Sequence, residues 1–149
     1  MSSAPLRPGV RYGPLTGYVG YALRRAQLAT VTRFVGALKE LDLRPTQFAV
    51  LTVIKENPGV RQTEVCTALG IQKANFVPLL NELQRRGLAL RKVGVADRRS
   101  SALHLTVQGE ALLQHARELH DSYEAGLEAR LGSRGRDQLL GLLSRLIEA

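Results

Sequence analysis

The sequence is poor in cysteine and has no long apolar run, and both absences restrict the class of protein. Cys66 is the only cysteine among 149 residues, so the chain cannot form an internal disulfide. A lone thiol is typical of a reducing cytoplasm. No stretch reaches the roughly 18 apolar residues that suggest a membrane-spanning helix. Residues 1–17 also lack the apolar segment of a secretory signal. We therefore expect a cytoplasmic protein.

The sequence also lacks the motifs of common catalytic sites. It has no glycine-rich phosphate loop, no nucleophile elbow and no pair of metal ligands on a helix. Its three histidines, His104, His115 and His120, match no metal-ligand spacing. The sequence therefore predicts neither an enzyme nor a cofactor or metal site.

Positive charge is what the chain has in excess, and it is unevenly distributed. The formal net charge is +8. Residues 1–44 carry seven basic and two acidic side chains, residues 61–99 carry eight and three, and residues 100–149 carry five and seven. A basic middle beside a slightly acidic C-terminal third indicates one positive face, which favours a polyanion as partner.

Apolar spacing predicts a mainly helical chain of one domain. Arg44-Pro45 is expected to end the first helix, Thr46 to cap the second, and Gly70 and Gly87 to end later ones. The expected helices cover about residues 15–41, 47–56, 62–69, 72–86, 107–131 and 135–147, and the expected strands cover residues 88–93 and 102–105.

A short helix, a glycine turn and a second helix form the pattern of a DNA-reading helix-turn-helix. The basic hairpin that follows would be its wing. The expected fold class is therefore mainly α with a small two- to three-stranded β wing.

Four segments, in this order, resemble the MarR family of bacterial transcriptional regulators. They are residues 45–51 (PTQFAVL), residues 64–71, residues 79–88, and the wing DRRS at residues 97–100 with LTVQG at residues 105–109. The resemblance covers roughly residues 15–149.

The resemblance implies a homodimer that reads a palindromic operator, with a ligand cleft between the dimer region and the DNA-binding lobe. It implies an N-terminal arm at residues 1–14 and a first dimerisation helix at residues 15–44. The winged lobe would cover residues 45–106, and C-terminal dimerisation helices would cover residues 107–149. The expected function is a DNA-binding regulator, in the form of a repressor released by a small molecule.

The helix at residues 72–86 is the candidate recognition helix, which would enter the major groove. Gln72 and Asn75 suit adenine, and Lys73 suits guanine or a phosphate. Phe76 would either touch a thymine methyl or pack into the core. Pro78 either kinks the helix or marks a later start. Arg85 and Arg86 are interpreted as solvated charges at a helix C-terminus.

The wing supplies the remaining DNA candidates. Arg99 is at the position of the family's groove-reading arginine and suits a narrow minor groove. Arg98 would meet phosphate, and Asp97 would order the tip through hydrogen bonds. Non-specific phosphate contacts are expected from Arg61, Arg91 and Lys92.

An effector site is expected where aromatic rings accompany arginines, a pairing that suits an aromatic carboxylate or an aromatic acyl-CoA. Alternatively, the tyrosines line the dimer interface. The candidates are Tyr18, Tyr21, Arg24, Arg25 and Phe48.

Two other functions stay open. Cys66 would make the chain a redox-responsive regulator if its thiol were exposed and reactive, although its place within a short helix favours a core role. The lobe would otherwise be a winged-helix interaction module that binds no DNA, but such a module is expected to lose Lys73, Arg98 and Arg99.

Overall fold

The computed structural model describes residues 7–93 and 101–148, which divide into two compact units between Arg33 and Phe34. Six α-helices and a three-stranded antiparallel sheet make up the described chain. None of its helices is long and apolar enough to cross a membrane. The wing tip, residues 94–100, lies outside the described residues, and so do the predicted contacts of Asp97, Arg98 and Arg99.

The N-terminal unit contains a 3₁₀ turn, η1 (Gly13–Gly17), and the larger part of helix α1 (Val19–Leu38). Two tyrosines of the unit lie near each other, with the ring centroids of Tyr12 and Tyr21 6.4 Å apart. The Tyr12 hydroxyl accepts a hydrogen bond from the backbone N–H of Arg7 at 3.2 Å. The segment before η1 is thereby tied to itself and to the first turns of α1.

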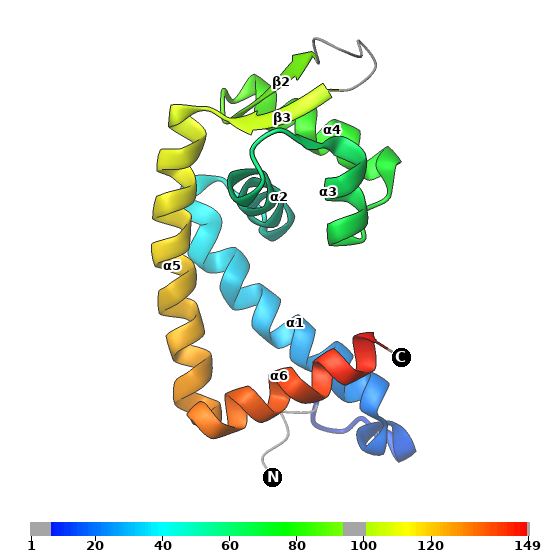
Figure 1. Cartoon of the computed structure of the whole chain (residues 1–149). Helices are drawn as coiled ribbons and strands as arrows, with labels where there is room; N and C mark the ends of the chain where they lie inside the picture. Colours follow the sequence, from blue (N-terminus) through cyan, green and yellow to red (C-terminus); the bar gives the residue numbers. More distant parts are fainter. Residues whose placement is uncertain (1–6, 94–100, 149) are drawn as a thin grey trace. The chain divides into compact units, whose positions relative to one another are not determined.

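The second unit begins with the last residues of α1 and a short 3₁₀ turn, η2 (Lys39–Leu41). Helices α2 (Pro45–Glu56), α3 (Gln62–Leu69) and α4 (Lys73–Arg85) follow. Figure 1 shows α3 and α4 on one side of α2, beneath the sheet. Strand β1 (Val60–Arg61) pairs with β3 (Ser101–Leu105), which pairs with β2 (Ala89–Val93). The hairpin register sets Ala89 opposite Leu105 and Val93 opposite Ser101.

Helix α2 begins at Pro45, two residues earlier than the sequence suggested, so the capping role predicted for Thr46 is wrong. Pro45 takes the first helical position, where its fixed φ fits and no N–H is needed. Arg44 occupies the N-cap position, and the side chain of Gln47 accepts the Arg44 N–H at 2.9 Å.

One apolar core holds the second unit together. Val50, Leu51 and Ile54 of α2 pack with Phe76, Leu80 and Leu83 of α4. The same core receives Leu38 from α1, Leu103 from β3, and Leu113 and Ala116 from α5 (Val107–Leu131). It therefore joins the sheet, the helix-turn-helix and two flanking helices into one body.

Helix α5 starts against the lobe and leads into α6 (Ser133–Ile147), which turns off at Gly132 (φ 71°). The Thr106 side chain caps α5 by accepting the Gly109 N–H at 2.9 Å. Two ion pairs join the end of α2 to α5. They are Lys55 Nζ to Glu110 Oε1 at 2.8 Å and Arg117 Nη2 to Glu56 Oε1 at 2.6 Å.

Candidate nucleic-acid interface

Helix α4 combines an apolar buried side with a polar exposed start, as a recognition helix requires. Phe76, Leu80 and Leu83 have no exposed surface, and their spacing of four and three residues places them on one face. Gln72, Lys73 and Asn75 are exposed at the other face. The core therefore fixes α4 while its first turn stays open to a partner.

The turn before α4 is built by glycine. Gly70 adopts a left-handed conformation (φ 61°), and its N–H caps α3 by meeting the carbonyls of Cys66 and Thr67. An L-residue with a side chain adopts this conformation less readily. Three residues therefore suffice to connect the end of α3 to the start of α4.

The start of α4 carries positive charge that no acidic residue of its first turn offsets. Its N-cap, Gln72, makes no side-chain capping bond, and its first turn holds no acidic residue. The positive end of the helix dipole therefore adds to the charge of Lys73. A pocket of about 540 Å³ opens beside this end, and its lining residues are Arg44, Thr46, Gly70, Ile71, Gln72, Asn75 and Leu79. These amide, hydroxyl and guanidinium groups suit base edges and phosphates.

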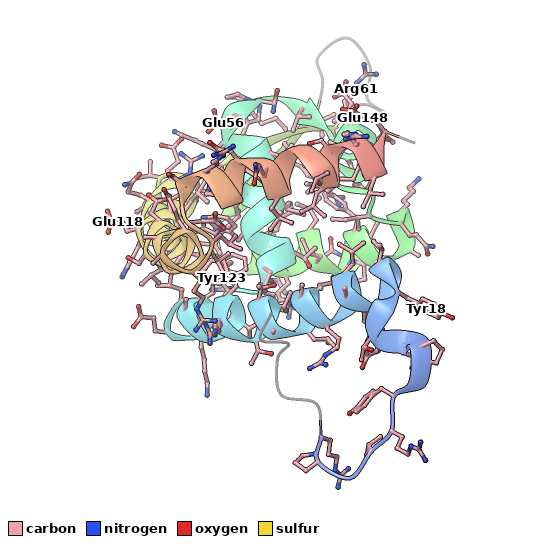
Figure 2. The ribbon with its side chains drawn as sticks, turned by 90° about the horizontal axis from the view of Figure 1, so that it is seen from below. Tyr18, Glu56, Arg61, Glu118, Tyr123 and Glu148 are labelled. Carbon is pink, nitrogen blue, oxygen red and sulfur yellow. The ribbon has the colours of Figure 1, made fainter. Side chains whose placement is uncertain are left out.

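The predicted phosphate contacts are exposed and lie on the sheet. Arg91 and Lys92 are exposed on β2. Arg61 lies on β1, and its guanidinium is 3.7 Å from Glu64, while its N–H meets the same carboxylate at 2.8 Å. Figure 2 labels Arg61 at the edge of the lobe. Arg61 therefore occupies the N-cap position of α3, where Glu64 accepts its N–H, and it also offers a positive charge.

The structure decides two predictions for α4, the DNA contact of Phe76 and the role of Pro78. The thymine contact predicted for Phe76 is wrong, because its ring is 0% exposed and forms part of the core. Pro78 does not mark a later start, since α4 runs unbroken from Lys73 with Pro78 as its sixth residue. Pro78 is exposed and leaves the carbonyl of Ala74 without its usual helical partner.

The interpretation of Arg86 as a solvated charge is also wrong. Arg86 follows α4, and its guanidinium donates to the carbonyls of Asp42 at 2.6 Å and Leu41 at 3.0 Å. One turn earlier, Glu82 forms an ion pair with Arg44. These partners are about forty residues apart in the sequence, so no local pattern could have indicated them.

An aromatic cluster of four rings surrounds Phe48, the predicted effector residue of α2. Phe48 stacks on His120 with centroids 5.2 Å apart, and Phe34 stacks on Tyr123 at 5.4 Å. Phe34 also meets His120 and Phe48 edge-on, at 5.0 and 5.6 Å. All four rings are half-buried. Figure 2 shows Tyr123 and Glu118 on different sides of α5.

Sequence reasoning missed three members of this cluster. The spacing of His120 and Tyr123, one helical turn apart, was the available signal for a shared face. Phe34 joins them from α1. Such rings accept a planar partner by stacking.

The other predicted effector residues lie in the N-terminal unit. The Arg25 guanidinium lies 5.8 Å from the centroid of the Tyr21 ring, a cation–π arrangement. Tyr18 and Arg24 are exposed. The predicted pairing of aromatic rings with arginines is therefore present at Tyr21 and Arg25.

Cys66 is half-buried in α3 and packs against the core, which agrees with the core interpretation. Among residues 7–93 and 101–148, no cluster of three or more potential metal ligands is present.

Comparison with known proteins agrees with the fold. A sequence model described as the MarR family matches residues 41–100. A protein of Thauera aromatica, named for transcriptional regulation of the hcr operon, is 31% identical over 136 residues. The match covers 91% of this chain and 82% of that protein.

Two solved structures of the transcriptional repressor CouR are also similar. One, bound to a 23-mer DNA duplex, has 41% identity and a TM-score of 0.89, and the match covers 93% of this chain and 98% of that one. The other, bound to p-coumaroyl-CoA, has 38% identity and a TM-score of 0.87, and the match covers 93% and 97%.

Proposed function

The chain belongs to the MarR family of DNA-binding transcriptional regulators, and from this premise we propose that it is a repressor of a palindromic operator, released by an aromatic effector. The observation that carries the proposal is the start of α4, where Gln72, Lys73 and Asn75 are exposed while the apolar face of the same helix is fully buried in the core. A repressor of this family works on DNA in the cytoplasm.

The DNA contacts follow from this geometry. Gln72 and Asn75 would read bases in the major groove, with Lys73 on guanine or a phosphate. Arg61, Arg91 and Lys92 would meet the backbone. At the wing tip, Arg99 would enter the minor groove, Arg98 would contact phosphate, and Asp97 would order the tip.

A dimer is proposed from the surface of α6. No residue of this described helix is buried, yet it carries five apolar side chains that are between 41% and 84% exposed. An amphipathic helix is stabilised by burying its apolar face. A second copy of the chain would supply that cover, since a palindrome requires two lobes related by a two-fold axis. The apolar residues are Leu139, Leu140, Leu142, Leu146 and Ile147.

An aromatic acyl-CoA or carboxylate is the proposed effector class. The rings around Phe48 offer stacking surfaces, and Tyr21 with Arg25 offers a ring beside a cation. The ligand of CouR, p-coumaroyl-CoA, combines an aromatic ring with anionic phosphates. The half-buried position of Cys66 in the core gives no support to thiol sensing.

Fluorescence anisotropy on the DNA upstream of the protein's own gene tests the proposal. We expect binding at least about 10³-fold tighter than to a scrambled duplex. Asn75→Ala should lose about 1–3 kcal/mol of discrimination between bases at one position of each half-site. Light scattering should give the mass of two chains. Binding that is equally weak on both duplexes and disappears with salt would reject sequence-specific regulation.

A further inference from the structure

The segment that joins α1 to α2, residues 41–44, is held at two points by the C-terminal half of α4. Arg86 donates one N–H to the carbonyl of Asp42 at 2.6 Å and another to the carbonyl of Leu41 at 3.0 Å. Glu82, one turn earlier in α4, forms an ion pair with the guanidinium of Arg44. Both ends of the segment are therefore fixed to the recognition helix.

The backbone conformation of the segment depends on such support. Asp42 adopts a left-handed conformation (φ 47°, ψ 43°), and it is the one non-glycine with positive φ among residues 7–93 and 101–148. Residues with a side chain adopt this region rarely and keep it where neighbouring contacts enforce it. The planar guanidinium of Arg86 spans two successive carbonyls, which a lysine ammonium does not match.

The same segment is fixed to the end of α1. Leu38, the last residue of α1, and Leu43 are both buried in the core, and the Leu43 N–H meets the Leu38 carbonyl at 3.3 Å. The last turn of α1, residues 41–44 and the end of α4 are therefore a continuous set of contacts. A shift of the end of α1 has to carry the end of α4 with it or break these bonds.

We propose that Arg86 is a positioning residue for DNA binding, through which the end of α1 sets the orientation of α4. The inference rests on the proposed dimeric DNA-binding function and adds a role for a residue remote from the exposed start of α4. In a dimer, the spacing between the two recognition helices would then depend on Arg86. Without Arg86, the core would still hold α4 within its lobe, but the end of α4 would lose its hydrogen bonds to residues 41 and 42, and the spacing between the lobes would be less strictly fixed.

Arg85 provides a matched control. It is the neighbouring residue with the same charge, it is exposed, and no contact of its guanidinium is found within the described part of the chain. Arg85→Ala and Arg86→Ala change the net charge equally, so a difference between them cannot be a general electrostatic effect. Arg86→Lys keeps the charge but removes the planar guanidinium that bonds to both carbonyls.

The experiment uses a palindromic duplex selected by the wild-type chain from a random pool. Variants carry one base pair inserted or deleted at the centre, which rotates one half-site by about a tenth of a helical turn. We expect the wild type and Arg85→Ala to prefer the selected spacing by about tenfold or more. Arg86→Ala should bind all three spacings nearly equally, Arg86→Lys should be intermediate, and all should bind a single half-site equally.

Hydrogen exchange on the free full-length chain supplies a second readout. In Arg86→Ala, amides of residues 41–44 should exchange faster, while those of Leu80 and Leu83 in the core should keep wild-type rates. An Arg86→Ala variant that retains the spacing preference, or an Arg85→Ala variant that loses it equally, overturns the positioning role. A wild type that selects no sequence from the pool overturns the proposed function itself.

Discussion

Gly109 lies directly against the carbonyl of Leu88, so closely that a Cβ on Gly109 would be 1.9 Å from that oxygen. The same carbonyl accepts the Thr106 N–H at 3.1 Å, and the Thr106 hydroxyl donates to the Gly87 carbonyl at 2.5 Å. The first turn of α5 therefore packs backbone to backbone on the chain between α4 and β2. This contact sets the direction in which α5 leaves the lobe.

Gly109→Ala should destabilise the fold strongly, because the obstacle is backbone and cannot rotate away. We expect a loss of about 3 kcal/mol in the free energy of unfolding, at the upper end of overpacking costs. Urea unfolding at a fixed protein concentration measures it.

Gly126→Ala is the control for this loss, since Gly126 also lies within α5 but has open space at its Cβ position. It should gain up to about 1 kcal/mol from helix propensity. Equal stability of the two variants would show that α5 can shift at its start and that the close contact does not constrain the lobe.

Pro78→Ala should stabilise the protein. An alanine at this exposed position restores an N–H that can reach the Ala74 carbonyl within α4. The expected gain is about 1 kcal/mol, the net contribution of one hydrogen bond. Pro58→Ala, in the turn after α2, is the control and should not stabilise, because there the proline only restricts the unfolded chain. A loss of stability in Pro78→Ala would mean that the conformation of α4 depends on the proline.

Helix positions were the part of the fold that local patterns could predict. The helices at residues 62–69 and 107–131 match their expected bounds, because apolar spacing, Gly70 and Thr106 act within a few residues of each helix end. A third strand was allowed for in the wing, but the position of β1 was not predicted, since its two residues gain their conformation from pairing with β3 about forty residues away.

The site shows the same division. The polar start of α4 was predicted from its own residues, whereas the contacts of Arg86 and the rings around Phe48 depend on tertiary neighbours. For Phe76 the sequence leaves a DNA contact and a place in the core both open, because spacing alone does not reveal which face of α4 the core covers. The roles of Asp97, Arg98 and Arg99 stay predictions, since these residues lie outside the described chain.

Arg99→Ala should weaken operator binding without changing the midpoint of thermal unfolding. A guanidinium in a narrow minor groove interacts with an enhanced negative potential. Its removal should lower the affinity for DNA at least about tenfold and make that affinity less dependent on salt concentration. Arg130→Ala, near the end of α5 away from the sheet, removes the same charge and should leave affinity unchanged. If both variants weaken binding equally, the effect of Arg99 is explained by net charge alone and not by a contact of the wing.

Phe48→Leu should weaken the binding of an aromatic effector more than it weakens the fold. Leucine keeps much of the apolar volume but removes the ring that stacks on His120, so the unfolding free energy should fall by less than about 1.5 kcal/mol. If the effector ring joins this cluster, affinity for p-coumaroyl-CoA, measured by calorimetry on the DNA-free protein, should fall about three- to tenfold. Tyr18→Leu tests the other predicted location, because Tyr18 is exposed in the N-terminal unit. A loss of affinity in Tyr18→Leu with none in Phe48→Leu would contradict a role for the cluster and assign the effector ring to the N-terminal tyrosines.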